Sequence, residues 1–419
     1  MADFPQLGAT IDFGNGAAFV STALTLDSAT LGLLDTAQLA DGVDLVDISP
    51  IILQASIRRG RNRYLDKFEA GTATVVLQDS TGAWNAANVS SPYYGKLLPL
   101  RKIQIFADYN GVRYFLFSGF ITSFITNFSI GNEDQSTVTL QCADGFRLLY
   151  NVNVSTVTGT SSPQLSGARI SSMLDYVSWP TTQRAIDTGD STMQADPATQ
   201  RSLLDALQLV ADKSEFGAFF MDVHGNATFL SRTNATARSG ATPTVYSDDG
   251  IQIGYQDISI AHDDVLVVND VAVTRLGGVT QEVFDATSIA TYFTHSGSRT
   301  DILVQTDAEA LNQATMILAA RKDATLRIDS LTLNLFDSSA PTRIVAGLST
   351  DIFQPVNVTK TMPGASSITT QLLVQGVWHD ITKKSFITKV LTSQPILLGM
   401  ILDDAVHGVL DGSSSLLSY

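Results

Sequence analysis

Alternating apolar and polar residues predict that the chain between residues 46 and 395 is mainly β structure. Gly71 to Gln78 (GTATVVLQ) is rich in β-branched residues and alternates as a strand does. Segments 102–109 and 112–117 flank Asn110-Gly111, a strong hairpin signal, because both turn positions need a positive φ. Further strands are expected at 119–128 and 136–143. Short strands at this spacing predict a sandwich or barrel, and we assign it to residues 46–151.

The pattern changes period after this first β-module. Residues 152–168 are rich in Ser, Thr and Gly and are interpreted as a linker. Residues 169–177 predict a short helix, and Asp196-Pro197 predicts the start of another, with an acidic N-cap followed by proline. A hairpin is expected around His224-Gly225-Asn226. Together these elements predict an α+β insert domain over 165–233. The apolar face of its second helix comprises Leu203, Ala206, Leu207, Val210 and Ala211.

A second β-rich module is expected over 245–395, after a linker at 234–244. Thr306-Asp307-Ala308-Glu309 has the pattern of a capping box and opens a helix over 307–322. We expect the strands of this module to wrap around that helix. The predicted fold class of the whole chain is mainly β, that is, a β-rich α+β protein. The expected strands are 251–255, 265–275, 302–304, 326–336, 351–358, 369–379 and 385–391.

Composition favours a protein that buries surface in an assembly. The 419 residues include 26 Lys and Arg against 41 Asp and Glu, a net charge of -15. Hydrophobic residues make up 44%, which argues against a disordered chain. Charged residues make up only 16%, below the roughly 25% of average soluble proteins. The single cysteine, Cys142, excludes a disulfide framework and a multi-cysteine metal site.

Two acidic segments flank this nearly neutral body, at residues 1–45 and 396–419. Residues 1–50 contain seven Asp and no Lys or Arg. Both segments contain the pattern L-D-x-A-x-x-G-x-L-D, at 26–35 and 402–411. We interpret them as docking segments that meet basic surfaces on neighbouring chains; solvated tails and a chance repeat are the alternatives. The candidate interface residues are Asp27, Asp35, Asp403 and Asp411.

One basic cluster, Arg58, Arg59, Arg61 and Arg63, stands out in this acidic chain. We predict that it lies at a subunit interface, where charge reversal should block assembly and leave the monomer folded. A solvated loop is the alternative. Nucleic-acid contact is disfavoured because the chain is acidic and no aromatic residues are interleaved with the arginines.

Catalytic and cofactor signatures are absent from the sequence. It has no G-x-S-x-G, H-E-x-x-H or P-loop motif, and its five His are scattered. We therefore expect a protein that is not an enzyme and needs no cofactor or metal. The N-terminus lacks a signal-peptide pattern, and no apolar run near the C-terminus approaches the ~20 residues of a membrane span. A soluble protein made in the cytoplasm is expected.

An ordered series of motifs runs over residues 56–120, from Arg59-Gly60-Arg61 through DKFEAGTATV at 66–75, Trp84-Asn85 and Ser91-Pro92-Tyr93-Tyr94 to Phe117-Ser118-Gly119. This series resembles the minor tail proteins of long-tailed phages that infect actinobacteria. Later segments extend the resemblance to about residues 46–395, among them Val374 to Thr382 (VQGVWHDIT). None of these motifs is catalytic, so their specificity lies in their order and number.

The resemblance implies the hub of the tail tip, or baseplate, in the virion. It implies a homotrimer in which each chain supplies two β-barrels like those of the tail tube, so that the ring joins the sixfold tube to threefold parts below. The implied partners are the distal tail protein or tail tube, other minor tail proteins or fibres, the tape measure protein and, in passage, the phage DNA. We expect channel-lining side chains to carry no net positive charge. The alternatives are a hexameric distal tail protein, a tail-associated cell-wall hydrolase and a carbohydrate-binding adhesin.

Overall fold

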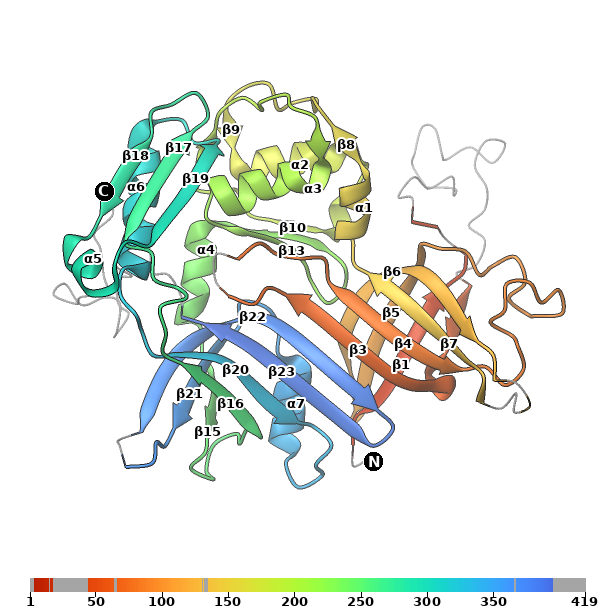
Figure 1. Cartoon of the computed structure of the whole chain (residues 1–419). Coiled ribbons are helices and arrows are strands. Elements are labelled where there is room, and N and C mark those ends of the chain that lie inside the picture. The colour runs from red at the N-terminus through yellow and green to blue at the C-terminus, as the bar shows by residue number, and fades with distance from the viewer. Residues whose placement is uncertain are drawn as a thin grey trace.

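The computed structural model describes residues 4–14, 16–17, 44–63, 66–129, 131, 135–364 and 367–394. These residues form a large, mostly antiparallel sheet, an α+β insert, and a separate three-stranded sheet that has its own helices (Figure 1). The β-rich fold class is confirmed. In the part of the chain that the structure describes, no helix is both long and apolar enough to cross a bilayer.

Strands from both ends of the chain build the large sheet, which is called here the shared sheet. Its order is β16-β20-β23-β22-β3-β4-β7-β6-β5-β1-β2, and β21 and β15 extend it beside β22. The first group of strands is β1 (Gln6–Asp12), β2 (Leu45–Asp47), β3 (Ile52–Gly60), β4 (Thr72–Gln78), β5 (Arg101–Tyr109), β6 (Val112–Asn127) and β7 (Thr137–Ala143). The second group is β15 (Thr244–Ser247), β16 (Asp257–Ala261), β20 (Arg327–Asn334), β21 (Pro355–Lys360), β22 (Ile368–Thr382) and β23 (Ser385–Ser393).

The two predicted β-modules are hydrogen-bonded to each other through β3 and β22. These strands pair antiparallel from Gly376 opposite Gly60 to Thr382 opposite Gln54. One hydrophobic core follows, since apolar residues of both groups pack together on one side of the sheet. That core includes Ile57, Val75, Leu140, Val377 and Val390, all fully or almost fully buried.

The hairpin predicted at Asn110-Gly111 is present between β5 and β6. Asn110 has a φ of 50° and Gly111 a φ of 79°, as a two-residue turn of this kind requires. The two strands predicted at 112–117 and 119–128 are instead one strand, β6, of 16 residues. Irregular registers against β5 and β7 let this long strand bend without ending.

The α+β insert packs its helices over its own three-stranded sheet, formed by β10, β14 and β13. In the view of Figure 1 it lies above the shared sheet. The apolar positions predicted from Leu203 to Ala211 are all fully buried. A six-residue π-helical segment, Leu209–Ser214, follows helix α3 directly. The insert's elements are α1 (Phe146–Asn151), α2 (Ser166–Tyr176), α3 (Leu203–Gln208), α4 (Arg232–Ala237), β10 (Arg184–Ile186), β13 (Ala218–Met221) and β14 (Ala227–Leu230), together with the short strands β8 (Asn153–Val154), β9 (Gln164–Leu165), β11 (Thr192–Met193) and β12 (Arg201–Ser202).

Three local predictions in and around the insert were wrong. The helix expected from Asp196-Pro197 begins at Leu203, with Ser202 as its N-cap, because the Asp196 carboxylate binds Arg201 at 2.6 Å and stabilises a turn. The segment 152–168 is not a free linker, since β8 pairs with β12, β9 pairs with β11, and α2 starts within it. The linker expected at 234–244 overlaps α4, which Ser231 caps.

A separate three-stranded sheet, called here the small sheet, consists of β17 (Asp270–Arg275), β18 (Gln281–Phe284) and β19 (Ser296–Ile302). Helix α5 (Ala286–Tyr292) lies beside it. The predicted capping box is present at the start of α6 (Asp307–Arg321), where Thr306 and Glu309 bond each other's backbone N–H groups. Helix α6 packs on β17 and β18, so its expected place inside the second β-module needs correction. The helix that contributes to the shared core is α7 (Pro341–Ser349), through Ile344 and Leu348. The strand expected at 251–255 is absent apart from a single bridge at Ile253.

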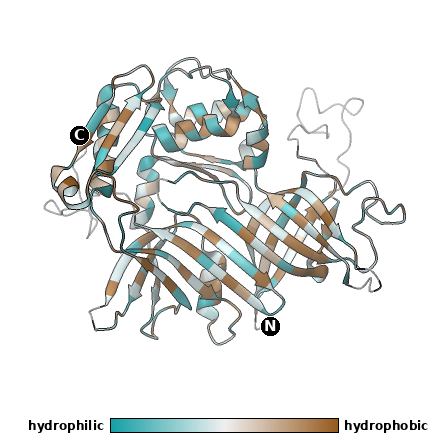
Figure 2. Cartoon of the chain, viewed as in Figure 1, coloured by the Kyte–Doolittle hydropathy of each residue, from teal (hydrophilic) through white to brown (hydrophobic). Residues whose placement is uncertain are grey.

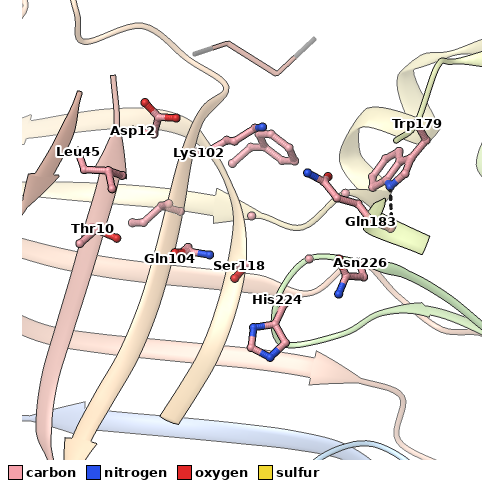
Figure 3. Close-up of a pocket in the computed structure, with 15 residues that line it drawn as sticks. Thr10, Asp12, Leu45, Lys102, Gln104, Ser118, Trp179, Gln183, His224 and Asn226 are labelled. Carbon is pink, nitrogen blue, oxygen red and sulfur yellow. Dashed lines mark hydrogen bonds between the residues drawn. The ribbon is translucent and has the colours of Figure 1, made fainter. Parts of the chain in front are cut away.

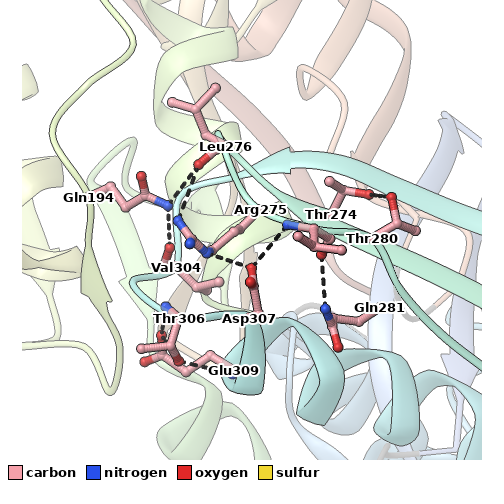
Figure 4. A network of polar contacts seen from close by, with 11 residues as sticks. Gln194, Thr274, Arg275, Leu276, Thr280, Gln281, Val304, Thr306, Asp307 and Glu309 are labelled. Atoms are coloured by element: carbon pink, nitrogen blue, oxygen red, sulfur yellow. Dashed lines mark hydrogen bonds and ion pairs between the residues drawn. The ribbon is translucent and has the colours of Figure 1, made fainter.

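A polar network ties the insert to the small sheet (Figure 4). The Gln194 amide donates to the carbonyl oxygens of Leu276 and Val304, at 3.3 and 2.5 Å. Arg275 Nε donates to Asp307 Oδ1 at 2.7 Å, which fixes the first turn of α6 against β17. These contacts hold the two parts in a defined orientation.

The close approach of β3 and β22 predicts that Gly60 is indispensable for the shared sheet. Its φ is +95°, and an added Cβ would lie 2.3 Å from the Gln375 carbonyl oxygen. We expect Gly60→Ala to lower the free energy of unfolding by roughly 2–5 kcal/mol, from left-handed strain and overpacking together. Chemical denaturation of the purified variant measures this loss.

Gly111→Ala is the matched control. Gly111 also has a positive φ, +79°, but its Cβ would enter open space. We expect only the strain cost there, about 1–2 kcal/mol. Equal losses for the two variants would show that the backbone contact at the junction contributes nothing.

Candidate functional site

The outer side of the shared sheet is a continuous, mostly polar surface, which we call the polar face. Directly opposed residues of antiparallel strands point to the same side, so the register defines its members. Figure 2 shows the alternation of hydrophobic and hydrophilic residues along these strands. The members are Asp257, Ser259, Thr332, Asn334, Ile387, Lys389, Trp378, Asp380, Thr382, Gln54, Ser56, Arg58, Thr72, Thr74, Val76, Thr137, Thr139, Gln141, Ser123, Ile125 and Asn127.

Hydroxyl and amide side chains dominate the polar face, and its few charges balance. Arg58 and Lys389 are offset by Asp380 and Asp257. Arg58 Nη2 lies 2.9 Å from both carboxylate oxygens of Asp380, across the junction of β3 and β22. Arg58 and Lys389 also stand over the Trp378 ring, at 5.0 and 5.4 Å from its centroid. The face therefore offers no cluster of unmatched positive charge.

The arginine cluster predicted from the sequence does not form one surface, because successive residues of a strand point to opposite sides of the sheet. Arg58 points to the polar face, whereas Arg59, one residue later, points inward and is only 5% exposed. Arg59 Nη2 binds Asp351 at 2.7 Å. Arg61 is 6% exposed; it donates to Gln375 Oε1 at 2.9 Å and lies over the Phe68 ring.

Two of the four predicted interface arginines are thus buried inside this chain, and Arg58 is paired with Asp380 at its surface. Arg63 is half-buried, and its charge lowers the pKa of Asp263 after the larger effect of Arg327. The subunit-interface role of the cluster stays a prediction, and the side chains that reach the surface for it are Arg58 and Arg63. The candidate acidic residues Asp27, Asp35, Asp403 and Asp411 lie outside the described residues.

Buried titratable groups support the fold around this junction. Burial raises the pKa of Asp144 to about 7, although it accepts hydrogen bonds from the N–H groups of Gly71 and Phe146. Burial likewise raises the pKa of Asp212 to about 7, against the opposing effect of Arg61. His379 is buried beside Thr388, and burial lowers its pKa to about 3, so it is neutral at physiological pH. Sequence reasoning missed these groups because their burial depends on contacts between distant segments.

The described residues contain no group of three or more His, Cys, Asp or Glu side chains placed to hold a metal ion. Cys142 is buried in the shared core, and burial raises the pKa of its thiol, so it is not a reactive nucleophile.

The architecture is a β-rich fold built on one large, mostly antiparallel sheet and several smaller ones. No family model matches the chain, and no curated protein sequence matches it. Among solved structures, the chain is similar to a tail protein from Neisseria meningitidis MC58, with a TM-score of 0.59 and 12% identity over 94% of this chain and 98% of that one. It is also similar to the 43 kDa tail protein of prophage MuSo2 from Shewanella oneidensis, with a TM-score of 0.54 and 12% identity over 84% and 97%. The resemblance to tail proteins is thereby confirmed at the level of the fold.

The buried carboxyl of Asp212 predicts a specific pH dependence of stability. Its folded pKa of about 7 lies above the ordinary 3.8, so the native state holds this proton more tightly than the unfolded state. Its contribution to stability is complete at low pH and is lost as pH rises from about 4 to 7, by up to about 1.4 kcal/mol per pH unit. We expect Asp212→Asn to flatten the fall of unfolding free energy between pH 5 and 7, as measured by urea titrations.

Asp257→Asn, which removes an exposed carboxylate from the polar face, is the control and should follow the wild-type profile. Parallel profiles for Asp212→Asn and the wild type would contradict the assignment.

Proposed function

We propose that this protein is a structural component of a phage tail, placed at the tail tip as a homotrimeric hub. The observation that carries the proposal is the fold match over almost the full length of both chains to a tail protein. The likeness to a prophage tail protein supports the same reading. The restriction to phages of actinobacteria rests on the sequence motifs alone.

The two ends of the shared sheet suit a ring. Among the described residues, β16 and β2 each pair on one side only. An exposed strand edge is a template for pairing with another chain, and closed symmetry is the common way to occupy such edges. Three chains, each with two β-rich groups of strands, would supply six units and match a sixfold tube.

The polar face suits the lining of a channel that DNA must pass. Phosphates bind proteins mainly through Lys and Arg, which displace counterions. Threonine, serine and glutamine dominate this face, and Arg58 is neutralised by Asp380 at 2.9 Å. A DNA chain sliding along such a surface would meet few fixed positive charges to hold it.

The proposed partners are the distal tail protein or tail tube on one side and other minor tail proteins or fibres on the other. The tape measure protein and the DNA would occupy the channel in turn. The acidic segments at 1–45 and 396–419 are proposed to dock on neighbouring chains, with Arg63 as the candidate basic contact, because Arg58 is already paired with Asp380. The protein would be made in the host cytoplasm and would reside in the virion.

The proposal predicts the mass of the particle in solution. Three copies of the 44.9 kDa chain give about 135 kDa by light scattering coupled to size exclusion. A particle of six copies would instead favour the distal tail protein. A monomer at every concentration up to the micromolar range characteristic of weak protein–protein complexes would oppose both rings.

Edge pairing predicts which substitutions disturb the ring. Ser259→Lys places a charged side chain on the exposed edge strand β16. We expect it to shift the particle toward monomer in the same light-scattering measurement. Thr74→Lys is the matched control, since it adds the same charge to the same face on β4, which is paired on both sides. If Ser259→Lys assembles as Thr74→Lys does, β16 is not the subunit contact.

A further inference from the structure

A pocket of about 320 Å³ lies where the insert meets the shared sheet (Figure 3). This volume falls at the small end of the range for small-molecule sites, about 300–1,000 Å³. The pocket lies over β1, β5 and β6, with Leu45 of β2 at its border, and it adjoins the polar face on the same side of the sheet. It does not depend on the proposed ring.

The floor of the pocket is two rows of side chains set by strand register. Thr10, Gln104 and Ser118 form one row across β1, β5 and β6. Asp12, Lys102 and Phe120 form the next. Directly opposed residues point to one side of a sheet, so all of these side chains face the pocket side.

The opposite wall comes from the insert. His224 and Asn226 lie on the turn between β13 and β14, and Gln183 lies beside Trp179 (Figure 3). This wall is held in place by three hydrogen bonds. Ser118 Oγ donates to the Val223 carbonyl at 2.8 Å, Asn226 Nδ2 donates to Asp222 at 2.9 Å, and Trp179 Nε1 donates to the Gln183 carbonyl at 3.0 Å. The pocket is therefore formed before any ligand arrives.

The lining combines neutral polar groups with balanced charge. Asp12 and Lys102 are opposite each other in the register, so their charges offset. Within the described residues, the side-chain amides of Gln104 and Gln183 make no hydrogen bond. An amide both donates and accepts hydrogen bonds, as a ligand hydroxyl does. A charged ligand would gain little here, whereas a neutral ligand with several hydroxyls could satisfy both amides.

We propose that this pocket binds a single neutral sugar residue. The mixture of amides, the Thr10 hydroxyl and the His224 imidazole supplies donors and acceptors around a space of monosaccharide scale. Phe120 and Trp179 give it an apolar boundary. The sugar is either a free molecule or one unit of a glycan, and methyl glycosides distinguish these two sources.

The test is saturation-transfer NMR and calorimetry on the full-length protein with neutral hexoses, pentoses, N-acetylated hexosamines and their methyl glycosides. At least one should bind. Gln104→Ala should weaken it on the order of five- to tenfold, the effect of losing one or two hydrogen bonds. Gln104 is exposed and makes no internal hydrogen bond among the described residues, so the variant should keep the wild-type stability.

Gln54→Ala is the matched control, because Gln54 is an exposed glutamine on β3 outside the pocket. It should leave the affinity unchanged. Binding of methyl glycosides assigns a glycan unit, and binding of free reducing sugars alone assigns a free sugar; both support the site. The proposal is overturned if no neutral sugar binds, if inorganic phosphate binds in their place, or if both variants change affinity equally.

Discussion

The pairing of β3 with β22 is the interaction on which the rest of the structure depends. It joins segments more than 300 residues apart in sequence, and the Ser56–Asp380 hydrogen bond across it spans 324 residues. Because strands from both ends of the chain share one sheet, their apolar sides form one core and their polar sides one surface. The pairing requires a close backbone approach at Gly60 and Gly376, where side chains would collide with the partner strand.

The arginines around this junction have separate tasks that follow from the two-residue period of a strand. Arg58 faces outward and neutralises Asp380, while Arg59 turns inward to Asp351. Arg61 lies over the rings of both Phe68 and Phe353 and bonds Gln375, so it links the sheet to the hydrophobic core of the insert. The sequence suggests a single basic surface patch, but Arg59 and Arg61 are buried and stabilise the interior through their bonds. These buried members of the cluster are satisfied by bonds to segments far away in the sequence, Arg59 to Asp351 and Arg61 to Gln375.

The outer side of the sheet has two kinds of surface. Across β16 to β6 it is rich in hydroxyl groups and balanced in charge, which suits the passage of a polyanion without retention. Farther along, across β6, β5 and β1, the insert approaches it and leaves a partly open pocket lined by polar and apolar groups. In our proposals, the centre of this sheet lines a channel, its edge strands β16 and β2 contact neighbouring subunits, and the pocket binds a ligand. The insert creates this difference, because Trp179 and the turn between β13 and β14 approach that part of the sheet.

Local signals in the sequence were sufficient for the hairpin at Asn110-Gly111, the capping box at Thr306 and the buried helical face from Leu203 to Ala211. Each depends on residues a few positions apart, whose backbone preferences act in the same direction as the final fold. The helix start at Asp196-Pro197 failed because its carboxylate binds Arg201 instead of capping a helix. The joining of the two β-rich stretches, the place of α6, the inward turn of Arg59 and the pocket were decided by tertiary structure. They arise from contacts between segments far apart in the chain, whose partners no local pattern specifies.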